Sequence, residues 1–373
     1  MKKLLILSNA SGYGGAEKSI EILLRPLSEK YNITIITENL AHADELSEIK
    51  DTQQITCKII RLIPGNGMLT LLKNCTFLYK LLRENKPDYI LANTNKAGFY
   101  LALLSYMKLP KNNIFLYIRD FQWKYRWFIM CQLKQARLLF PTAALLEKKN
   151  YIDTFMRKHK FFYLGDPIAQ EEQKARQVGE QYILCLANLS RWKGIDYLIE
   201  SYAECMKTVE NSIKLVICGS KVDDLYYNKI QQLIRDKNIQ KTVNIIPFQK
   251  DVGELYSNAL FVAITSISDH GGPETFGRTI VEAWSYQKAV IAFKCGGPQY
   301  LIDDGINGFL VEEKDINNFE ILLPKIEEQT AIAEILATAD RELQLQKEKL
   351  AQLQTQKKGL MQVLLTGKKR LIN

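Results

Sequence analysis

The sequence contains no long hydrophobic run and no cysteine pattern. No stretch approaches the roughly 18 consecutive apolar residues of a membrane span. The apolar run from Leu4 to Leu7 is too short for the core of a signal peptide. The seven cysteines are scattered without a C-x-x-C pair, which argues against a disulfide framework and a zinc site. We therefore expect a cytoplasmic protein with reduced cysteines.

Histidine is also scarce, with three residues at positions 42, 159 and 270. A metal site would have to be built from carboxylates, and no carboxylate cluster with suitable spacing is present. We expect neither a metal nor a resident cofactor.

Positive charge is in excess. Fifty Lys and Arg residues against 41 Asp and Glu residues give a net charge of +9. This balance favours anionic partners, namely phosphates, an anionic membrane surface or nucleic acid. Apolar residues make up 47% and charged residues 24% of the chain, as in globular proteins. A length of 373 residues predicts two domains rather than one.

Short runs rich in Ile, Val and Leu alternate with segments of helical spacing, first over residues 2–118 and again over 182–311. This alternation predicts parallel sheets covered by helices. The turn Gly165-Asp166-Pro167 and a charged stretch separate the two sets. We therefore predict an α/β protein with two doubly wound, Rossmann-like domains at residues 1–165 and 166–318.

The composition changes near Phe319, where glycines nearly vanish and Gln, Glu, Lys and Leu begin to dominate. Counted in sevens from Leu336 to Leu364, the a and d positions are apolar except for Gln346 and Lys357. This pattern predicts that residues 319–373 form a long helix with a coiled-coil seam that needs a partner helix.

Two glycine-containing junctions follow predicted strands. Gly14 and Gly15 open a helix after the first strand, where free N–H groups attract phosphate and glycine lets the backbone approach a ligand. Arg191 and Lys193 lie at the equivalent junction of the second domain and suit a diphosphate. A plain turn and a solvated pair of cations are the alternatives.

The segment after strand 260–265 is the most informative. Glu274 is expected in a loop, and Glu282 in the helix that follows Gly277. The first carboxylate could accept sugar hydroxyls and the second could accept ribose hydroxyls. The alternative is that Glu274 is a first-turn acid favoured by the helix dipole and that Glu282 is an ordinary surface residue of the helix. The pair Gly296-Gly297 follows another strand at the same predicted edge.

Together these motifs resemble glycosyltransferase family 4, a GT-B group, over residues 1–318. The residues that carry the resemblance occur in family order: Gly14-Gly15-Ala16-Glu17, Lys193-Gly194, Pro273-Glu274-x-Phe276-Gly277, Glu282, Gly296-Gly297 and Asp304-Gly305-x-Asn307-Gly308-Phe309-Leu310-Val311. The resemblance implies two facing domains with a donor cleft between them. It also implies retaining transfer of a sugar from a nucleotide-diphospho-sugar to a glycan or lipid-linked acceptor, without a metal.

The resemblance also implies residue roles. Gly15, Arg191 and Lys193 would hold the diphosphate, Glu274, Phe276 and Gly277 the donor sugar, and Glu282 the ribose. Gly14, Gly296 and Gly297 complete the predicted donor site.

Three departures from the family pattern stand out. Ala187-Asn188-Leu189 replaces a frequent Gly-Arg-Leu, so Arg191 is the nearby arginine. Arg119-Asp120 stands where the family often has His-Asp, so Arg119 is expected to contribute charge, and no general base is apparent. Tyr300 replaces a common Glu. The predicted catalytic residues are Glu274, Arg119 and Asp120.

Residues 121–130 mix Trp and Tyr with Lys and Arg, which suits a membrane interface. An aromatic stripe packed in the core is the favoured alternative for this segment. The predicted location is cytoplasmic with a peripheral position at the inner membrane face.

Residues 320–370 resemble the conserved C-terminal helix of type I restriction specificity subunits, through the segments Leu323-Pro324-Lys325-Ile326-Glu327-Glu328-Gln329, Ile332-Ala333-Glu334-Ile335-Leu336 and Lys357-Lys358-Gly359-Leu360-Met361. In that family the helix docks the methyltransferase subunit. We interpret the chain as a chimera. The alternatives are an inactive transferase with an association helix, a restriction-modification component and a same-fold epimerase. Nucleic acid binding is not expected, because no recognition domain is present.

Overall fold

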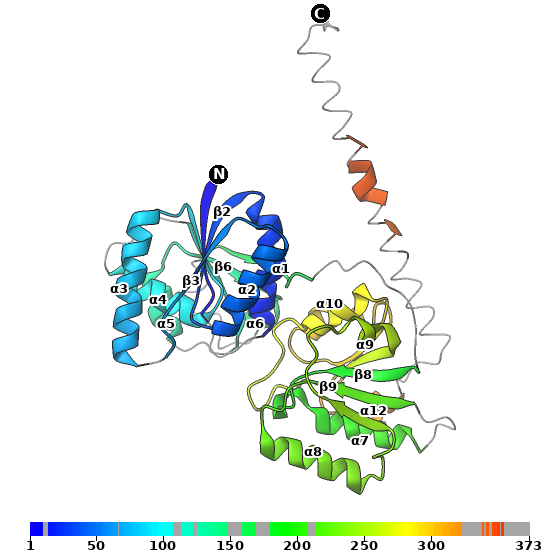
Figure 1. The fold of residues 1–373 in the computed structure, drawn as a ribbon. Helices are drawn as coiled ribbons and strands as arrows, with labels where there is room; N and C mark the ends of the chain where they lie inside the picture. Colours follow the sequence, from blue (N-terminus) through cyan, green and yellow to red (C-terminus); the bar gives the residue numbers. More distant parts are fainter. Residues whose placement is uncertain are drawn as a thin grey trace, which may run out of the picture.

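The computed structural model describes residues 1–9, 14–65, 67–106, 113–121, 125–147, 159–168, 180–207 and 213–321, and single turns between 338 and 353. These residues form a seven-stranded and a six-stranded sheet, each with helices on both faces (Figure 1). All pairings between neighbouring strands are parallel. The predicted α/β class with two Rossmann-like sheets is confirmed.

The first sheet has the strand order β3-β2-β1-β4-β5-β6-β7. Its strands are β1 (Lys2–Leu7), β2 (Tyr31–Thr37), β3 (Cys57–Arg61), β4 (Tyr89–Ala92), β5 (Asn113–Tyr117), β6 (Arg137–Phe140) and β7 (Phe161–Tyr163). The helices are α1 (Gly15–Ser28), α2 (Leu40–Thr52), α3 (Met68–Asn85), α4 (Asn95–Ser105), α5 (Arg126–Gln132) and α6 (Ala144–Glu147).

The second sheet has the order β10-β9-β8-β11-β12-β13. Its strands are β8 (Tyr182–Leu186), β9 (Lys214–Cys218), β10 (Val243–Ile246), β11 (Ala259–Ile264), β12 (Ala289–Phe293) and β13 (Phe309–Val311). The 3-10 helix η2 (Arg191–Lys193) precedes α7 (Ile195–Cys205), which is followed by α8 (Asp224–Asp236), α9 (Gly253–Asn258), α10 (Arg278–Ser285), α11 (Pro298–Leu301) and α12 (Ile316–Ile321).

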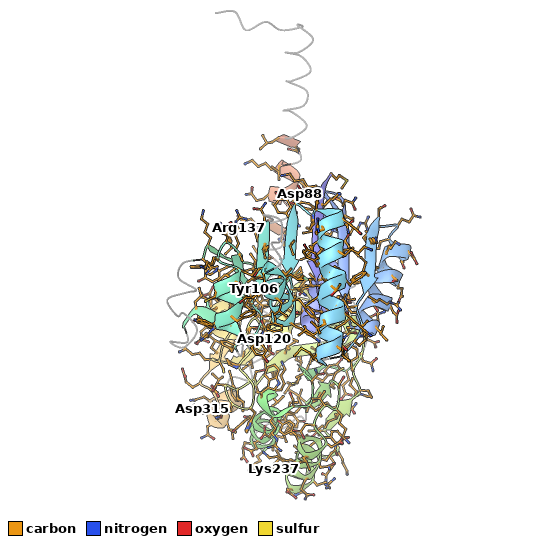
Figure 2. The ribbon with its side chains drawn as sticks, turned by 90° about the vertical axis from the view of Figure 1, so that its left-hand side faces the viewer. Asp88, Tyr106, Asp120, Arg137, Lys237 and Asp315 are labelled. Atoms are coloured by element: carbon orange, nitrogen blue, oxygen red, sulfur yellow. The ribbon has the colours of Figure 1, made fainter. Side chains whose placement is uncertain are left out.

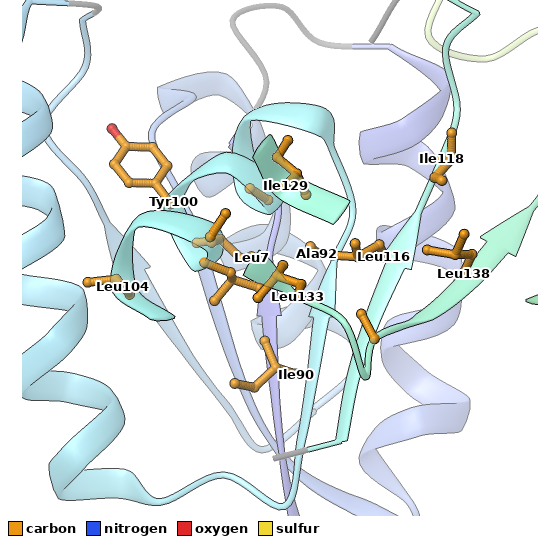
Figure 3. Packing of buried hydrophobic residues seen from close by; sticks show 14 of the residues in the cluster. Leu7, Ile90, Ala92, Tyr100, Leu104, Leu116, Ile118, Ile129, Leu133 and Leu138 are labelled. Atoms are coloured by element: carbon orange, nitrogen blue, oxygen red, sulfur yellow. The ribbon is translucent and has the colours of Figure 1, made fainter. Parts of the chain in front are cut away.

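The central strands are apolar on both faces because helices cover both. Leu7, Ala92 and Leu116 come from β1, β4 and β5 and share one core with Ile129 of α5 and Leu133 (Figure 3). A second core lies between the opposite face and helices α1 and α2. The continuous apolar runs of the sequence therefore correspond to doubly covered strands.

The carboxyl ends of the first sheet face the second domain. Asp88 precedes β4 and Arg137 begins β6, and both lie at the end of the domain away from the second domain (Figure 2). Asp120 follows β5 and lies at the opposite edge, next to the second domain. Polar residues that follow strands are thereby brought to the junction of the two domains.

Contacts from several elements join the domains. The Thr142 hydroxyl donates to the carbonyl of Thr275 at 2.7 Å. The ammonium of Lys250, in the loop after β10, lies 2.9 Å from the carboxylate of Glu45 in α2. Tyr300 of the second domain packs against the core of the first.

The helix α12 packs on α7. Its first carbonyl, of Ile316, accepts a hydrogen bond from Ser201 at 3.2 Å. This helix crosses the limit at residue 318 that the composition suggested, and the domain limits remain predictions. The described tail residues are helical and expose Leu345, Leu350 and Leu353. Among the a and d positions of the heptads, the structure describes Gln346, Leu350 and Leu353, and the others lie outside the described residues. The coiled coil and its partner helix therefore stay predictions.

We expect a chain that ends at Ile321 to keep most of the cooperative thermal transition, because all four buried hydrophobic clusters lie within residues 4–311. Circular dichroism melting of this variant beside the full chain measures the effect. A chain ending at Asp315 is the control: it loses α12, and each kcal/mol lost should lower Tm by about 2–4 °C in a domain of this size. Unfolding of the second domain in the Ile321 variant would contradict the expectation.

Candidate functional site

Lys193 and Glu274 form an ion pair in the second domain. Lys193 ends η2 after β8, and Glu274 lies in the loop between β11 and α10. Their side chains are 16% and 18% exposed. The Lys193 ammonium also lies 3.9 Å from the ring centroid of Trp192. A cation and an acid that the sequence assigned to different parts of one ligand therefore neutralise each other here.

The backbone around Lys193 is held by residues just after β11. Gly194 adopts a positive φ of 61°, and a Cβ at this position would lie 2.1 Å from the carbonyl oxygen of Thr265. The Thr265 hydroxyl donates to the Lys193 carbonyl at 3.1 Å. Only glycine fits this approach, so the Lys193-Gly194 motif has a local structural reason.

The glycine pair positions the loop that carries Glu274. The amide of Gly297 donates to the Glu274 carbonyl at 2.7 Å. Gly296 has a φ of 70°, and a Cβ there would lie 2.2 Å from the same carbonyl oxygen. A Cβ at Gly297 would lie 2.4 Å from the carbonyl oxygen of Phe276. These contacts give both glycines a positioning role, and their predicted ligand contact stays a prediction.

The Glu282 carboxylate is engaged at both oxygens. Oε1 accepts from Arg278 Nε at 2.7 Å, and Oε2 accepts from the Tyr256 hydroxyl at 2.9 Å. Burial raises the pKa of Tyr256 well above its ordinary value, so this residue stays a neutral donor. Each oxygen already accepts one hydrogen bond, and its second lone pair can accept another.

Arg278 also reaches the first domain. Its Nη1 lies 3.4 Å from the Gly15 carbonyl oxygen and 3.4 Å from the Ser19 hydroxyl. The start of α10 therefore meets the first turn of α1. At that turn, the Gly14 amide donates to the Glu17 carboxylate at 3.0 Å, so one of the helix-start N–H groups is already occupied. Burial raises the pKa of the Glu17 carboxyl.

Asp166, which the sequence placed in a turn, is a buried junction of hydrogen bonds. Its Oδ1 pairs with the Arg119 guanidinium and accepts from the Ser19 hydroxyl at 3.2 Å and from Tyr117 at 3.3 Å. The Arg119 and Asp166 side chains are 9% and 10% exposed. Arg119 was predicted as a catalytic charge, and that charge is balanced by Asp166. No sequence signal links these residues, because they lie 47 positions apart.

Asp120 lies beside Arg119 at the junction of the domains (Figure 2). Its Oδ2 accepts a hydrogen bond from Asn95 Nδ2 at 3.0 Å. Asp120 is exposed, but neighbouring protein atoms partly desolvate its carboxyl group and raise its pKa, and the charge of Arg119 opposes this rise. Among the described residues, no cation forms an ion pair with Asp120.

Several buried polar atoms at this edge have no hydrogen-bond partner within the described ranges. They are Asn9 Nδ2, Glu17 Oε1, Asn95 Oδ1 and Arg119 Nη2. Asn9, Asn95 and Arg119 lie two or three positions after the ends of β1, β4 and β5. Buried polar groups in native proteins have partners. The sequence reasoning missed Asn9 and Asn95, although a polar residue just after a buried strand was a usable signal.

The remaining predicted residues separate into two groups. Phe276 is buried, and its ring would lie 3.2 Å from a Cβ at Gly165, so it packs on the segment between the domains. Gly277, with a φ of 92°, is the N-cap of α10. Arg191 instead points to the N-cap of α8, where its Nε lies 3.4 Å from the Asp223 carboxylate. The structure thus joins Lys193 to the Glu274 loop and engages Arg191 elsewhere.

No group of three His, Cys, Asp or Glu residues suited to a metal occurs in the described part of the chain. Among the helices described, none is long and apolar enough to cross a bilayer. Residues 122–124 of the predicted membrane segment lie outside the described residues. Phe121, Ile129 and Met130 are buried in the core, whereas Tyr125 and Trp127 are 53% and 63% exposed.

Comparisons with known proteins find similarity that centres on the second domain. Residues 168–342 match the family model described as glycosyl transferases group 1. A probable sucrose-phosphate synthase of Thermosipho melanesiensis is 24% identical over 61% of this chain, which spans 60% of that relative's length. The N-acetylgalactosamine-N,N'-diacetylbacillosaminyl-diphospho-undecaprenol 4-alpha-N-acetylgalactosaminyltransferase of Campylobacter jejuni is 24% identical over 85% of this chain and 88% of its own.

Solved structures agree in fold. HepE of Anabaena, determined in complex with UDP-glucose, has a TM-score of 0.71 and 19% identity over 95% of this chain and 100% of its own. This likeness supports the GT-B fold. Within residues 168–342, the family match agrees with the resemblance that the motifs indicated.

The tail resemblance has weaker support. A putative type I restriction enzyme specificity subunit of Methanocaldococcus jannaschii is 22% identical over 94% of this chain and 92% of its own length. So distant a match does not single out residues 320–370, and the origin of the tail stays a prediction.

We expect Arg278→Ala to lower the free energy of unfolding by about 1–3 kcal/mol, because the partly buried Glu282 carboxylate loses a charged donor. Urea denaturation of the single variants and the Arg278→Ala/Glu282→Gln double variant measures the coupling. Lys80→Ala is the matched control, since Lys80 and Glu84 form an exposed i,i+4 pair at 3.9 Å. That pair should contribute about 0.5 kcal/mol or less. Equal losses in both pairs would contradict the expectation.

Proposed function

We propose that this chain, a group 1 glycosyltransferase of GT-B fold, transfers a sugar from a nucleotide-diphospho-sugar to an acceptor held at the first domain. The observation that carries the proposal is the Lys193 and Glu274 pair at the carboxyl edge of the second sheet. Both residues lie within the segment that matches the family. The ligands of open α/β sheets bind at this edge.

The charges of the pair suit the two ends of such a donor. The Lys193 ammonium neutralises the diphosphate, and the Glu274 carboxylate accepts hydrogen bonds from sugar hydroxyls. Because the two groups pair with each other, a donor that offers both an anion and hydroxyls can replace the ion pair without leaving either charge buried and unpaired. A ligand that offers only one of them strands the other charge.

The ribose is assigned to Glu282, on α10. Its carboxylate is held by Arg278 and Tyr256, which fix its direction. The Gly15 backbone on α1 stands opposite, in contact with Arg278. The nucleotide half of the donor would therefore be held where the two domains meet. Arg191 can serve the diphosphate only by leaving Asp223, so its role is secondary.

During transfer the bond from the sugar to the diphosphate breaks and a bond to the acceptor oxygen forms. Negative charge develops on the leaving diphosphate, where Lys193 stabilises it. The acceptor hydroxyl loses its proton in the same process, and the proton passes to an oxygen of the leaving diphosphate. Asp120 and the unpartnered atoms of Asn95 and Arg119 are the polar groups of the first sheet proposed to face that acceptor.

The acceptor class is proposed from chemistry and relatives. A relative from Campylobacter jejuni is named for a diphospho-undecaprenol-linked acceptor. We favour a glycan or lipid-linked acceptor, in the synthesis of a cell-surface polysaccharide. An inactive transferase that only associates through its tail is the alternative, and it would bind a donor without transferring or hydrolysing it.

Lys193→Ala and Glu274→Gln should each weaken binding of UDP- or GDP-sugars by roughly tenfold to a hundredfold, the equivalent of one lost charged hydrogen bond. Isothermal titration calorimetry with a panel of nucleotide-sugars measures this. Lys294→Ala and Glu312→Gln are matched controls, because these residues form an exposed ion pair at 3.1 Å in the same domain. If the site variants bind as tightly as the parent and the controls, the donor site is misplaced.

A further inference from the structure

The outward face of α3 is apolar at the start of the helix. Met68, Leu69 and Leu72 are 71%, 74% and 57% exposed, and Phe77 is also exposed. The opposite face contributes Leu78, Leu81 and Leu82 to the core. At 100° per residue, positions 68, 69 and 72 fall on one side of the helix. Large apolar side chains gathered on one exposed face indicate an interaction surface.

Cations lie on the same outward face. Lys73, Lys80 and Arg83 are exposed, and the acid on this face, Glu84, is paired with Lys80 at 3.9 Å. Arg83 lies over the ring of Tyr79, 5.7 Å from its centroid. The face therefore combines Leu, Met and Phe side chains with a surplus of positive charge.

Exposed aromatic residues lie in the same helical layer as α3. The helices α3 and α5 belong to one layer on one face of the first sheet, together with α4 (Figure 1). Figure 2 views this side of the molecule and shows Tyr106, which follows α4, beside α3. Tyr106 and Trp127 are 67% and 63% exposed. Tyr and Trp with one wet and one apolar end are typical of membrane interfaces.

We propose that this α3 surface, made of Met68, Leu69, Leu72, Lys73, Phe77, Lys80 and Arg83, binds an anionic lipid membrane. The apolar residues enter the boundary between headgroups and acyl chains, and the cations contact the lipid phosphates. The chain's net charge of +9 attracts it to such a surface.

A second exposed apolar group on the protein lacks this charge pattern. Val222 and Leu225, at the start of α8, are 58% and 73% exposed. They flank Asp223 and Asp224, which an anionic surface repels. Charge complementarity therefore selects α3 rather than α8 for the membrane and makes the α8 group a matched control.

The position of α3 relates this surface to the binding of the acceptor, and this step rests on the proposed function. The apolar start of α3 follows β3, so it lies at the carboxyl edge of the sheet. Asp120 follows β5 at that same edge. A membrane held along α3 would bring lipid-linked acceptors to the edge that faces the donor domain.

The test is co-sedimentation of the full chain with phosphatidylcholine vesicles that contain or lack phosphatidylglycerol. The parent should bind the anionic vesicles and lose binding at high salt. Leu69→Ser/Leu72→Ser and Lys73→Glu/Lys80→Glu should each reduce the partition coefficient about tenfold or more. Val222→Ser/Leu225→Ser should bind like the parent. Circular dichroism verifies that each variant is folded.

Two outcomes overturn the proposal. One is equal sedimentation of the α3 variants and the parent. The other is a dimer, seen by light scattering, that dissociates in Leu69→Ser/Leu72→Ser while vesicle binding is absent, because the occupant is then a second copy. Titration of the parent and the same variants with donor keeps the two proposals apart. Unchanged donor binding with lost vesicle binding in the α3 variants supports the membrane surface. A parent that binds no donor contradicts only the proposed function.

Discussion

The buried carboxylate of Asp166 holds the segment between the two domains against the first sheet. It neutralises Arg119 and accepts from Ser19 of α1 and Tyr117 of β5. Loss of one partner from such a pair leaves an uncompensated buried charge, at a cost of about 3–5 kcal/mol. The adjacent Gly165 lies against Phe276, so the same segment also supports the loop of Glu274. The junction of the domains therefore depends on this carboxylate.

Charges near the junction are paired inside the protein. Lys193 pairs with Glu274, Arg278 with Glu282, and Arg119 with Asp166. Burying an unpaired charge is costly, and each of these three pairs neutralises its own charges. In the proposed function, specificity follows from this arrangement: a donor must offer an anion and hydroxyls together. The site thereby selects for the chemistry of a nucleotide-diphospho-sugar rather than for a free anion.

The first domain presents two different surfaces. Its carboxyl edge gathers Asn9, Asn95 and Asp120 beside the second domain, because parallel strands end at one edge. Its outer layer presents the apolar and basic face of α3. Under the two proposals, the first surface receives the acceptor and the second keeps the protein where lipid-linked acceptors are found. One doubly wound sheet supplies both, since its edge and its covering helices are independent of each other.

The sequence by itself determined the two α/β domains and the motifs at strand ends. Periodicity and glycine junctions are local signals, and Gly194 and Gly296 fit backbone positions where a Cβ would collide. Only the tertiary structure decided the partners. Lys193 meets Glu274 across 81 positions, and Arg278 meets Gly15 across 263. Arg191, adjacent to the same motif, pairs with Asp223 instead. Such pairings depend on how whole sheets and helices pack, which no local pattern of residues encodes.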